Sequence, residues 1–304
     1  MIKIDFKIAV FFAAAKYLNF TKAAQELNIT QPAISRNIHE LEINAGKSLF
    51  KRNGNRLMLT EAGKLLFEHA QRLHNTYDML NESLDMLDGK LSGCLKLGAS
   101  TTLSHYIVPK LFADFHEAYP MVKIKALHGN SQQVEEWLGD NTIDLGILEG
   151  LSNNPSMKYE AFLKDELVLV ARHNHLKFKG KDHISAADLL ELEFVVREQG
   201  SGTNEVLYRA LSQIGVNWHN LDVRVVLAST EAIKNFLQNS DCVAFLSVYS
   251  IMKELENGEL KVVDIGGFEV KRDFFFVHPQ GVISGAADFF YRFAKKQFLN
   301  FRLQ

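Results

Sequence analysis

The sequence predicts an α/β protein with an N-terminal winged helix-turn-helix, a long linker helix and a C-terminal body of two subdomains. Two helical patterns separated by a turn occupy residues 19–42, apolar residues at heptad spacing follow the predicted wing, and short apolar runs alternate with amphipathic segments from about residue 91. The predicted domains are residues 1–60, 61–90 and 91–304, the last divided into subdomain I at about 91–162 and 268–304 and subdomain II at about 163–267.

The helix-turn-helix is indicated by its capping residues. Thr21 is placed to cap the first helix, and Asn28 suits the turn that follows it. Thr30 is placed to cap the second helix, in whose first turn Pro32 loses nothing by lacking an N–H group.

The second helix has a buried stripe and a polar outer face. Ile34, Ile38 and Leu41 recur at helical spacing and therefore face the core. On or beside the opposite face lie side chains that can contact base edges or phosphates. This candidate set is Thr30, Gln31, Pro32, Ser35, Arg36 and His39. The alternative is a helical hairpin whose polar face meets only water.

A wing is predicted after the second helix. Residues 53–54 are an Asn-Gly pair between two short apolar-bearing runs, which is the signal for a two-residue β-hairpin. Arg52 and Arg56 lie near its tip, where they suit phosphate contact or insertion into the minor groove, although cations there are also typical of solvated surface.

The charge distribution supports a nucleic-acid partner. Residues 1–60 hold nine Lys/Arg against four Asp/Glu, a balance of +5, so the chain total of -2 leaves -7 for the remainder. A basic head on an acidic body is expected where only one end of a chain meets a polyanion. We therefore expect double-stranded DNA to be a partner.

The composition favours a cytoplasmic protein. The N-terminal residues mix charged with apolar side chains and do not form a signal-peptide core, and no segment has the length of a membrane span, so we expect no membrane partner. Cys94 and Cys242 are far apart and have no metal-ligand spacing, which indicates reduced thiols and no metal site.

A long helix is predicted after the wing. Thr60 is placed to cap it, and a heptad seam runs through Leu66, Ala70, Leu73, Tyr77, Leu80, Leu84 and Leu87. Such a seam favours pairing with a second copy of the chain, and the alternative is a linker helix that lies along its own body. The helix is expected to end near residues 88–90 or 92–93.

The remainder predicts a doubly wound body. Predicted strands cover residues 95–99, 122–127, 143–148, 167–171, 194–196, 223–227, 243–246 and 274–277. Predicted helices cover residues 105–119, 132–138, 205–214, 231–238 and 286–298.

Hydroxyl-bearing residues follow several of these strands, at the edge where ligands bind in such folds. The clearest case is residues 200–203, where two glycines and two hydroxyls open a helix and can form an anion site. The lysine of a Walker motif is absent, and we expect no cofactor. The candidate set is Ser100, Thr101, Thr102, Asn130, Ser131, Gly200, Ser201, Gly202, Thr203 and Thr230. The alternative for each hydroxyl taken singly is a helix cap.

The chain resembles the LysR-type transcriptional regulators along its whole length. The resemblance rests on Phe11, residues 20–24, Leu27, residues 31–35, Ile38, residues 41–42, Gly46, residues 49–50, Arg52, residues 59–60 and residues 62–63. It implies a periplasmic-binding-protein-like effector domain, a homotetramer built as a dimer of dimers, promoter binding through pairs of winged helices, and a small co-inducer between the subdomains. We also expect RNA polymerase to be a partner.

Within this family, residues 98–102, 129–130, 148–150 and 197–203 resemble the branch of CysL-like and CbbR-like regulators, and the matching segment at 148–150 adds Glu149 to the effector-binding candidates. The family resemblance places DNA contacts on Thr30, Gln31, Pro32, Ser35, Arg36, Arg52 and Arg56, and effector contacts on Ser100, Thr102, Asn130, Ser201 and Thr203. Leu18 departs from the family, whose members often carry a small or polar residue there.

The effector is expected to be a small anion or carboxylate. Arg197, at a strand end, is the only full positive charge that we expect near this site, although a salt bridge to Glu198 or Glu149 is its simpler explanation. Two other functions are possible in principle for a chain of this organisation. An enzyme fused to a DNA-binding head would need chemistry from residues 104–105, residues 173–175 or a cysteine, but no nucleophile, base and orienting group can be assembled, so no catalytic residue is predicted. An exported solute-binding protein is disfavoured by the basic head.

Overall fold

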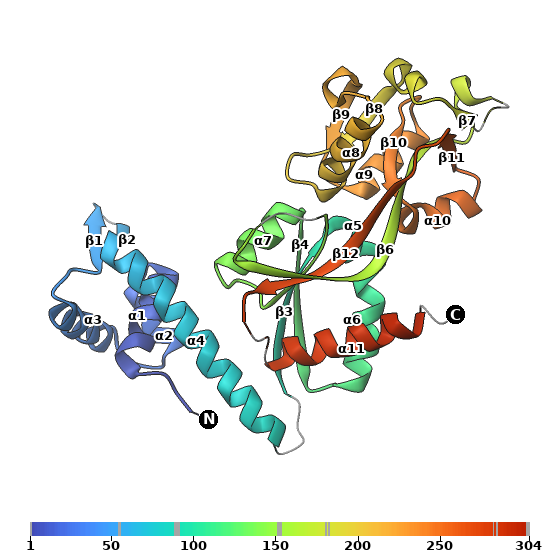
Figure 1. Cartoon of the computed structure of the whole chain (residues 1–304). Coiled ribbons are helices and arrows are strands. Elements are labelled where there is room, and N and C mark those ends of the chain that lie inside the picture. Colours follow the sequence, from blue (N-terminus) through green and yellow to red (C-terminus); the bar gives the residue numbers. More distant parts are fainter. Residues whose placement is uncertain are drawn as a thin grey trace. The chain divides into compact units, whose positions relative to one another are not determined.

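A computed structural model describes residues 2–53, 56–87, 92–150, 154–179, 181, 183–281, 283 and 285–301. The chain divides into two compact units, Met1–Ser92 and Gly93–Gln304 (Figure 1). Along the described parts of the chain, no helix combines the length and the apolar character needed to cross a bilayer.

The first unit is a winged helix-turn-helix followed by a long helix. Its elements are α1 (Phe6–Tyr17), α2 (Phe20–Glu26), α3 (Gln31–Ala45), β1 (Phe50–Asn53), β2 (Arg56–Leu59) and α4 (Glu61–Leu87). Phe11 and Ile34 are completely buried in its core, and the rings of Phe11 and Phe20 pack against Phe50 at 5.6 and 5.4 Å between centroids. Helix α1 supplies much of this core and was not among the predicted elements.

The caps of α2 and α3 were predicted with one error. Asn19, not Thr21, caps α2, because its side-chain oxygen accepts hydrogen bonds from the backbone nitrogens of Thr21 and Lys22 at 2.9 and 3.0 Å. Asn28 has a φ of 54°, as a turn residue should, and Thr30 caps α3 by accepting from the nitrogen of Ala33 at 3.4 Å. These two predictions are confirmed.

The wing pairs β1 with β2 in antiparallel register, with Asn53 opposite Arg56. This register leaves two residues between the strands, which is the loop length that the Asn-Gly signal predicts. They are Gly54 and Asn55, one position later than the predicted pair at 53–54, and both lie outside the described residues. Thr60 caps α4 as predicted, since its hydroxyl oxygen accepts from the nitrogen of Gly63 at 3.0 Å. The predicted end of α4 at residues 88–90 also lies outside the described residues.

The predicted seam of α4 is divided between the core and the surface. Ala70 is completely buried, and Leu66 packs against the same core. Farther along, Leu73, Leu80 and Leu84 are 41–44% exposed. The second half of the helix therefore presents an apolar row on the surface of its own unit.

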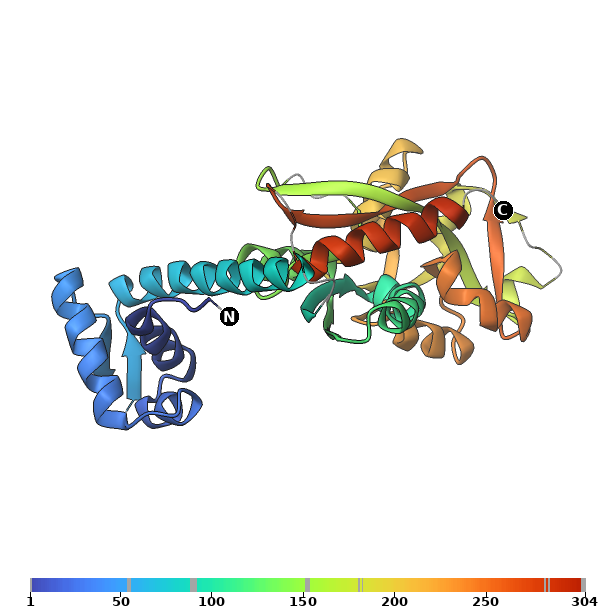
Figure 2. The same ribbon diagram turned by 90° about the horizontal axis from the view of Figure 1, so that it is seen from below.

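The second unit consists of two lobes. The first lobe contains β3 (Gly93–Ser100), β4 (Val122–Gly129) and β5 (Leu145–Glu149), with α5 (Thr101–Tyr106), α6 (Val108–Ala118), α7 (Ser131–Gly139) and α11 (Gly285–Phe301). Strand β3 pairs in parallel with both β4 and β5. Figure 2 shows α11 beside the strands of this lobe.

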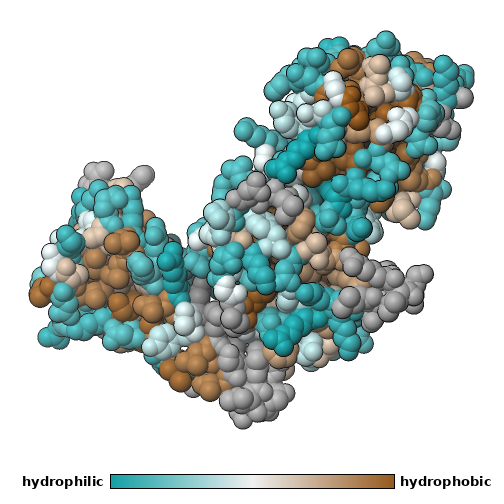
Figure 3. Space-filling model, in the orientation of Figure 1, coloured by the Kyte–Doolittle hydropathy of each residue, from teal (hydrophilic) through white to brown (hydrophobic). Residues whose placement is uncertain are grey.

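The second lobe holds two sheets and the intervening helices. Its strands are β7 (His183–Ile184), β8 (Glu193–Arg197), β9 (Asp222–Leu227), β10 (Ala244–Ser247) and β11 (Leu260–Ile265), and its helices are α8 (Gly202–Gln213), α9 (Thr230–Gln238), α10 (Val248–Glu256) and the short turns Leu176–Phe178, Ala187–Glu191 and Trp218–Asn220. On the face in Figure 3, hydrophilic residues cover much of the second unit, with apolar residues between them.

Two long antiparallel strands run through both lobes. They are β6 (Met157–Arg172) and β12 (Val270–Pro279), which pair from Leu167 opposite Val270 to Met157 opposite Pro279. The larger sheet has the order β4-β3-β5-β12-β6-β11-β7, and β10 pairs with the far half of β6 (Figure 1). The predicted α/β architecture of two subdomains is confirmed, and β6 and β12 form the joint between them.

Several elements of this unit differ from those predicted. The single helix predicted at residues 105–119 is two helices that meet at Ile107, because Pro109 starts a new first turn. The runs predicted at 167–171 and 274–277 are parts of β6 and β12, and β7, β11 and α10 were not predicted.

Candidate functional site

The outer face of α3 presents Arg36 to solvent. Its side chain is 83% exposed, and its Nε lies 3.8 Å from a carboxylate oxygen of Glu40. That carboxylate is bound more closely by Lys7, at 2.9 Å, and the hydrogen bond and charge of Lys7 lower the pKa of Glu40. Arg36 is therefore only weakly tethered and can reach a partner outside the protein.

The other predicted DNA contacts on α3 differ in whether their side chains already make hydrogen bonds within the protein. Gln31 is exposed, and its amide nitrogen donates to the hydroxyl of Ser35 at 2.9 Å. Pro32 and His39 are exposed, whereas the hydroxyl of Thr30 caps the helix. The structure thus places these residues at the start and along the outer face of one helix.

The wing is tied to α3 by a carboxylate that the sequence reasoning did not single out for this role. Glu42 accepts hydrogen bonds from the backbone nitrogens of Leu49 and Phe50 at 2.7 and 3.2 Å, which fixes the start of β1 against the end of α3. Arg52 is exposed on β1. The backbone of Arg56 lies in β2, but its side chain lies outside the described residues.

In the second unit, the predicted hydroxyls of the first lobe are buried where the lobes meet. Ser100 donates to the carboxylate of Glu149, and Thr101 donates to the carbonyl of Gly129 at 3.1 Å. Ser100, Thr102 and Glu149 are each no more than 2% exposed. The structure therefore gathers these candidates at the ends of β3 and β5.

Arg197 joins the second lobe to the first. It forms a two-point ion pair with Glu198, at 2.8 and 3.0 Å, as one of the two predicted salt bridges requires. Its Nη2 also donates to the hydroxyl of Thr101 at 3.0 Å, and its Nη1 lies 3.5 Å from the hydroxyl of Thr230. Arg197 is thus neutralised and has a partner for each guanidinium nitrogen.

The start of α8 packs tightly against the end of β5. Ser201 is the N-cap residue by position, but its hydroxyl caps nothing and has no hydrogen-bond partner among the described residues. A Cβ on Gly202 would lie 2.2 Å from the carbonyl oxygen of Glu149, so only glycine allows this approach. Gly200 has a φ of 83°, and Ser131 donates to the same carbonyl at 2.9 Å.

Asn130 is occupied by local structure. Its side-chain oxygen accepts from the nitrogen of Gln133 in a capping box, and its amide nitrogen donates to the carbonyl of Gln199 at 3.3 Å. The backbone nitrogen of Gln132 also donates to the carbonyl of Gly200 at 3.4 Å. The side chain of Asn130 therefore caps α7 in the first lobe and contacts the backbone of Gln199 in the second lobe.

Arg272 is a second buried cation at this junction, and the sequence reasoning missed it. Its Nε donates to Asp165 at 2.6 Å, its Nη1 donates to Thr203 at 3.0 Å, and the same nitrogen lies 4.0 Å from Glu149. The interpretation of Arg197 as the only nearby positive charge is therefore wrong. Arg272 lies in the charged triplet of residues 271–273, directly before the apolar run predicted as a strand at 274–277, and this position was the signal that could have identified it.

A further polar cluster joins the lobes through α5, α9 and α10. Tyr106 donates to Glu231, and burial together with this carboxylate raises the pKa of Tyr106. Lys234 binds Glu231 at 3.0 Å and Glu254 at 2.7 Å, and its ammonium lies 5.1 Å from the centre of the Tyr106 ring. This cluster fixes the two lobes at a second place.

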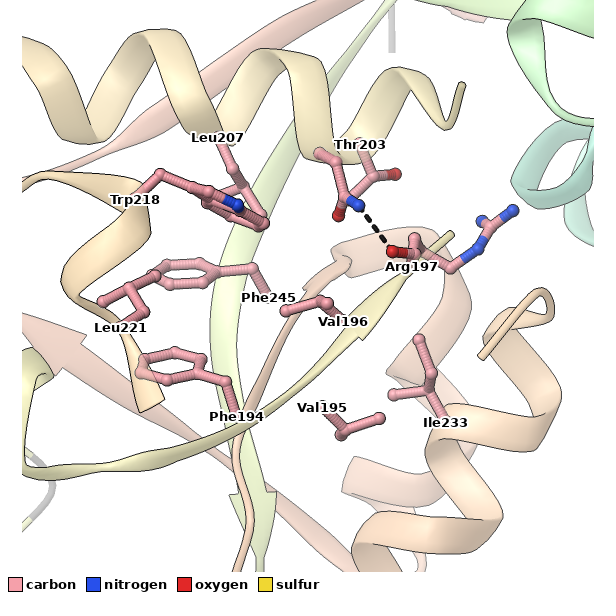
Figure 4. A pocket seen from close by; sticks show the side chains of 11 residues that line it. Phe194, Val195, Val196, Arg197, Thr203, Leu207, Trp218, Leu221, Ile233 and Phe245 are labelled. Carbon is pink, nitrogen blue, oxygen red and sulfur yellow. Dashed lines mark hydrogen bonds between the residues drawn. The ribbon is translucent and has the colours of Figure 1, made fainter. Parts of the chain in front are cut away.

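A cavity in the second lobe is too small to be the effector site. Its volume is about 10 Å³, which is room for about one water molecule. Figure 4 shows the aromatic side chains of Phe194, Trp218 and Phe245 gathered on one side, while the guanidinium of Arg197 points away from them. The cavity is a packing gap in the lobe core.

The residues weighed for enzyme chemistry have structural partners. Ser104 donates to the carbonyl of Thr101 at 2.9 Å within its helix. His175 is buried, its Nε2 is 2.7 Å from the carbonyl of Asp241, and its ring stacks on Phe178. Within the described ranges, no group of three or more His, Cys, Asp or Glu residues is arranged to hold a metal ion.

Two family descriptions match the two units. Residues 7–64 match "Bacterial regulatory helix-turn-helix protein, lysR family", and residues 88–299 match "LysR substrate binding domain". The chain belongs to the LysR family of transcriptional regulators. This LysR-type regulator carries an effector-binding domain behind its DNA-binding head, and the alternatives of a fused enzyme and of a solute-binding protein are wrong.

Named relatives support the finer resemblance to the CysL-like and CbbR-like branch. The chain is 30% identical to the HTH-type transcriptional regulator CysL of Bacillus subtilis over 271 residues, 89% of each chain. It is also 30% identical to the regulator CbbR of Rhodospirillum rubrum over 275 residues, 90% of each chain. A solved structure, the Synechocystis CcmR regulatory domain in complex with 2-PG, is 28% identical with a TM-score of 0.63 and covers 69% of this chain and 99% of its own.

Proposed function

We propose that this LysR-type regulator binds promoter DNA through Thr30, Gln31, Pro32, Ser35, Arg36, His39, Arg52 and Arg56, and that a small anion or carboxylate bound between the lobes controls it. The effector contacts in this proposal are Ser100, Thr101, Thr102, Asn130, Ser131, Glu149, Gly200, Ser201, Gly202, Thr203 and Thr230. The buried junction of the lobes, where the uncapped start of α8 meets these hydroxyls, is the observation that carries the proposal.

The chemistry of the junction supports an anion. The first N–H groups of a helix have no partner within the helix, and they carry the positive end of its dipole. Ser201 does not cap α8, so its hydroxyl and the N–H groups of the first turn are available to a ligand. The related CcmR domain is in complex with 2-PG, a small anion, which supports the same ligand class here.

The lobes provide a means of control. The lobes are connected by β6 and β12, which run through both of them. A ligand at the junction contacts both lobes and therefore favours one angle between them. In the proposed mechanism this angle sets the spacing of paired winged helices and thereby the bend of the bound promoter and its access to RNA polymerase.

Self-association completes the proposal. The exposed row of Leu73, Leu80 and Leu84 supports pairing of α4 with a second copy of the chain, and two such pairs would form a tetramer. A dimer places two recognition helices on successive half-sites of the same duplex face.

The test combines ligand binding with DNA footprinting. Thermal stabilisation of the full chain is measured against sulfur oxyanions, phosphates and small carboxylates, and each hit is repeated on Ser201→Ala and Thr102→Ala, with the exposed Ser212→Ala as the matched control. We expect a shift that the first two variants lose and the control keeps. A ligand that stabilises the protein but alters neither its footprint nor the DNA bend would refute the proposed control.

A further inference from the structure

Arg272 has unused binding capacity in a buried place. Its side chain is 2% exposed, yet Nη2 has no hydrogen-bond partner among the described residues. A buried N–H donor without an acceptor is unfavourable and rare in folded proteins. Arg197 contrasts with it, because each of its guanidinium nitrogens has a partner. Of these two cations, Arg272 is the one that can accept a new anionic partner.

A second unfilled group belongs to the same cluster. The hydroxyl of Ser201 is also buried without a partner in the described structure. Two residues farther on, Thr203 accepts a hydrogen bond from Arg272 at 3.0 Å. Both residues lie at the start of α8, a helix of 12 residues whose N-terminus has no side-chain cap. Two side-chain donors without partners among the described residues therefore accompany a helix N-terminus that has no side-chain cap.

Glu149 adds a requirement to this site. One of its carboxylate oxygens accepts from Ser100, and the other lies 4.0 Å from Arg272, beyond hydrogen-bond distance. With Asp165 also paired to Arg272, one guanidinium faces two carboxylates, and the formal charge of the cluster is -1. Repulsion by this charge opposes a simple anion. A ligand hydroxyl that donates to Glu149 would offset the repulsion.

We propose that Nη2 of Arg272 binds the anionic group of the effector and that Glu149 accepts a hydrogen bond from an effector hydroxyl. The effector is then a small hydroxylated anion, and this inference rests on the proposed effector site between the lobes. Ser201 and the first N–H groups of α8 supply further donors to the same anionic group.

The position of Arg272 links this binding to the joint of the domain. Arg272 lies on β12 and its partner Asp165 on β6, the two strands shared by the lobes, while Thr203 belongs to the second lobe and Glu149 to the first. A ligand held by Arg272 therefore contacts the structure where the angle between the lobes is set.

The test uses titration calorimetry on the full chain with two matched ligand pairs, malate against succinate and glycerol 3-phosphate against propyl phosphate. Within at least one pair, we expect the hydroxylated member to bind about tenfold more tightly. Arg272→Lys keeps a positive charge for Asp165 but removes Nη2, and we expect it to weaken binding by roughly tenfold to a hundredfold. Glu149→Gln should reduce the preference for the hydroxylated member. The control Arg292→Lys changes an arginine that is 76% exposed and should bind as the wild type does.

Each contrary outcome refutes a definite part. If Arg272→Lys binds normally while Ser201→Ala does not, the effector site stands and Arg272 is only structural. If the members of both pairs bind equally, the role assigned to Glu149 is wrong. If no ligand of either pair binds the wild type while the protein still shifts promoter DNA, the hydroxylated-anion class is wrong and the DNA-binding function stands. Should Arg272→Lys fail to fold, the double variant Asp165→Asn/Arg272→Gln tests the same loss. It removes the charges of Arg272 and Asp165 together and leaves Glu149 with its hydrogen bond from Ser100.

Discussion

Leu18 has an unfavourable backbone conformation. It ends α1 with a φ of 45° in the left-handed region, where Cβ comes too close to the following carbonyl oxygen. Glycine, which has no Cβ, and asparagine, whose short polar side chain can hydrogen-bond locally, are common there. Gly46 ends α3 in the same conformation with the residue type that suits it. Leu18 is 44% exposed, so its side chain recovers only part of this energy through packing.

We therefore expect Leu18→Asn to stabilise the DNA-binding unit by about 0.5–1 kcal/mol, because asparagine tolerates the left-handed region better than leucine. Denaturant unfolding followed by far-UV circular dichroism measures the change. Leu190→Asn is the matched control, since Leu190 is 46% exposed and is not among the residues with positive φ. No gain from Leu18→Asn, or an equal gain from the control, would contradict the argument.

The sequence predicted those site residues whose type and position before a helix indicate a binding role by themselves. Ser201 and Gly202 were identified because glycine and hydroxyl residues before a helix suggest an open N-terminus. Arg272 and Asp165 were missed because neither follows a strand. Their roles depend on the pairing of β12 with β6 across more than a hundred residues of sequence, which no local pattern encodes.

Among single elements, the spacing of apolar residues predicts a helix only where the helix has one apolar face. Helix α3 has a clear apolar stripe and was predicted, whereas α1 buries Val10, Phe11 and three successive alanines and shows no stripe. The first half of β6 was missed because charged residues such as Lys158 and Glu160 interrupt it. The pairing of that half with β12, rather than its own sequence, defines it as a strand.

The exposed leucine row of α4 is the surface through which two chains are expected to pair. We expect Leu80→Lys combined with Leu84→Lys to shift the protein toward smaller assemblies, because charges in an apolar seam oppose pairing of two helices. Light scattering after size-exclusion chromatography measures the mass. Glu68→Lys places a lysine at an exposed position on the opposite side of α4 and should leave the mass unchanged. An unchanged mass in the double variant would favour the alternative that α4 serves only as a linker.

Strand β6 and helix α11 are joined by a carboxylate with a strongly shifted pKa. Hydrogen bonds from Lys158, Tyr291 and Lys295 lower the pKa of Glu160 to about 2 from an ordinary 4.5. The ammonium groups of Lys158 and Lys295 lie 2.6 and 2.9 Å from its oxygens. Because the pKa is lower in the folded state, the stabilisation is full above pH 4.5 and is lost as the pH falls from 4.5 toward 2.

Glu160→Gln should therefore destabilise the protein at pH 7 by roughly 1–2 kcal/mol and reduce the loss of stability between pH 4.5 and 2. Thermal unfolding at a series of pH values measures both effects. Glu269→Gln removes a carboxylate that is 66% exposed beside Lys271, and it should change the acid dependence much less. A wild-type acid dependence in Glu160→Gln would show that this carboxylate does not link β6 to α11 energetically.

Across the whole chain, positive and negative charge are separated between the two units, so the net charge of the protein does not predict whether it attracts DNA. Residues 1–60 carry a balance of +5 and the remainder carries -7, so attraction to DNA must come from the head. This division, like the order of the units, follows from sequence alone, because it depends on composition and not on long-range pairing. The lobe junction could not be located in the same way, since its charges come from segments far apart in the chain.

DNA binding by the basic head should depend strongly on salt, and fluorescence anisotropy on an operator selected from random duplexes measures this dependence. Affinity should fall steeply with salt, and Arg52→Gln in the wing should reduce the slope of log K against log salt by about 1 while weakening all sequences alike. Arg292→Gln removes the same formal charge from the acidic second unit. If only direct phosphate contacts release counterions, Arg292→Gln should leave the slope unchanged. If both variants reduce the slope equally, net charge and not a wing contact determines this part of the salt dependence. If neither variant reduces it, Arg52 makes no phosphate contact.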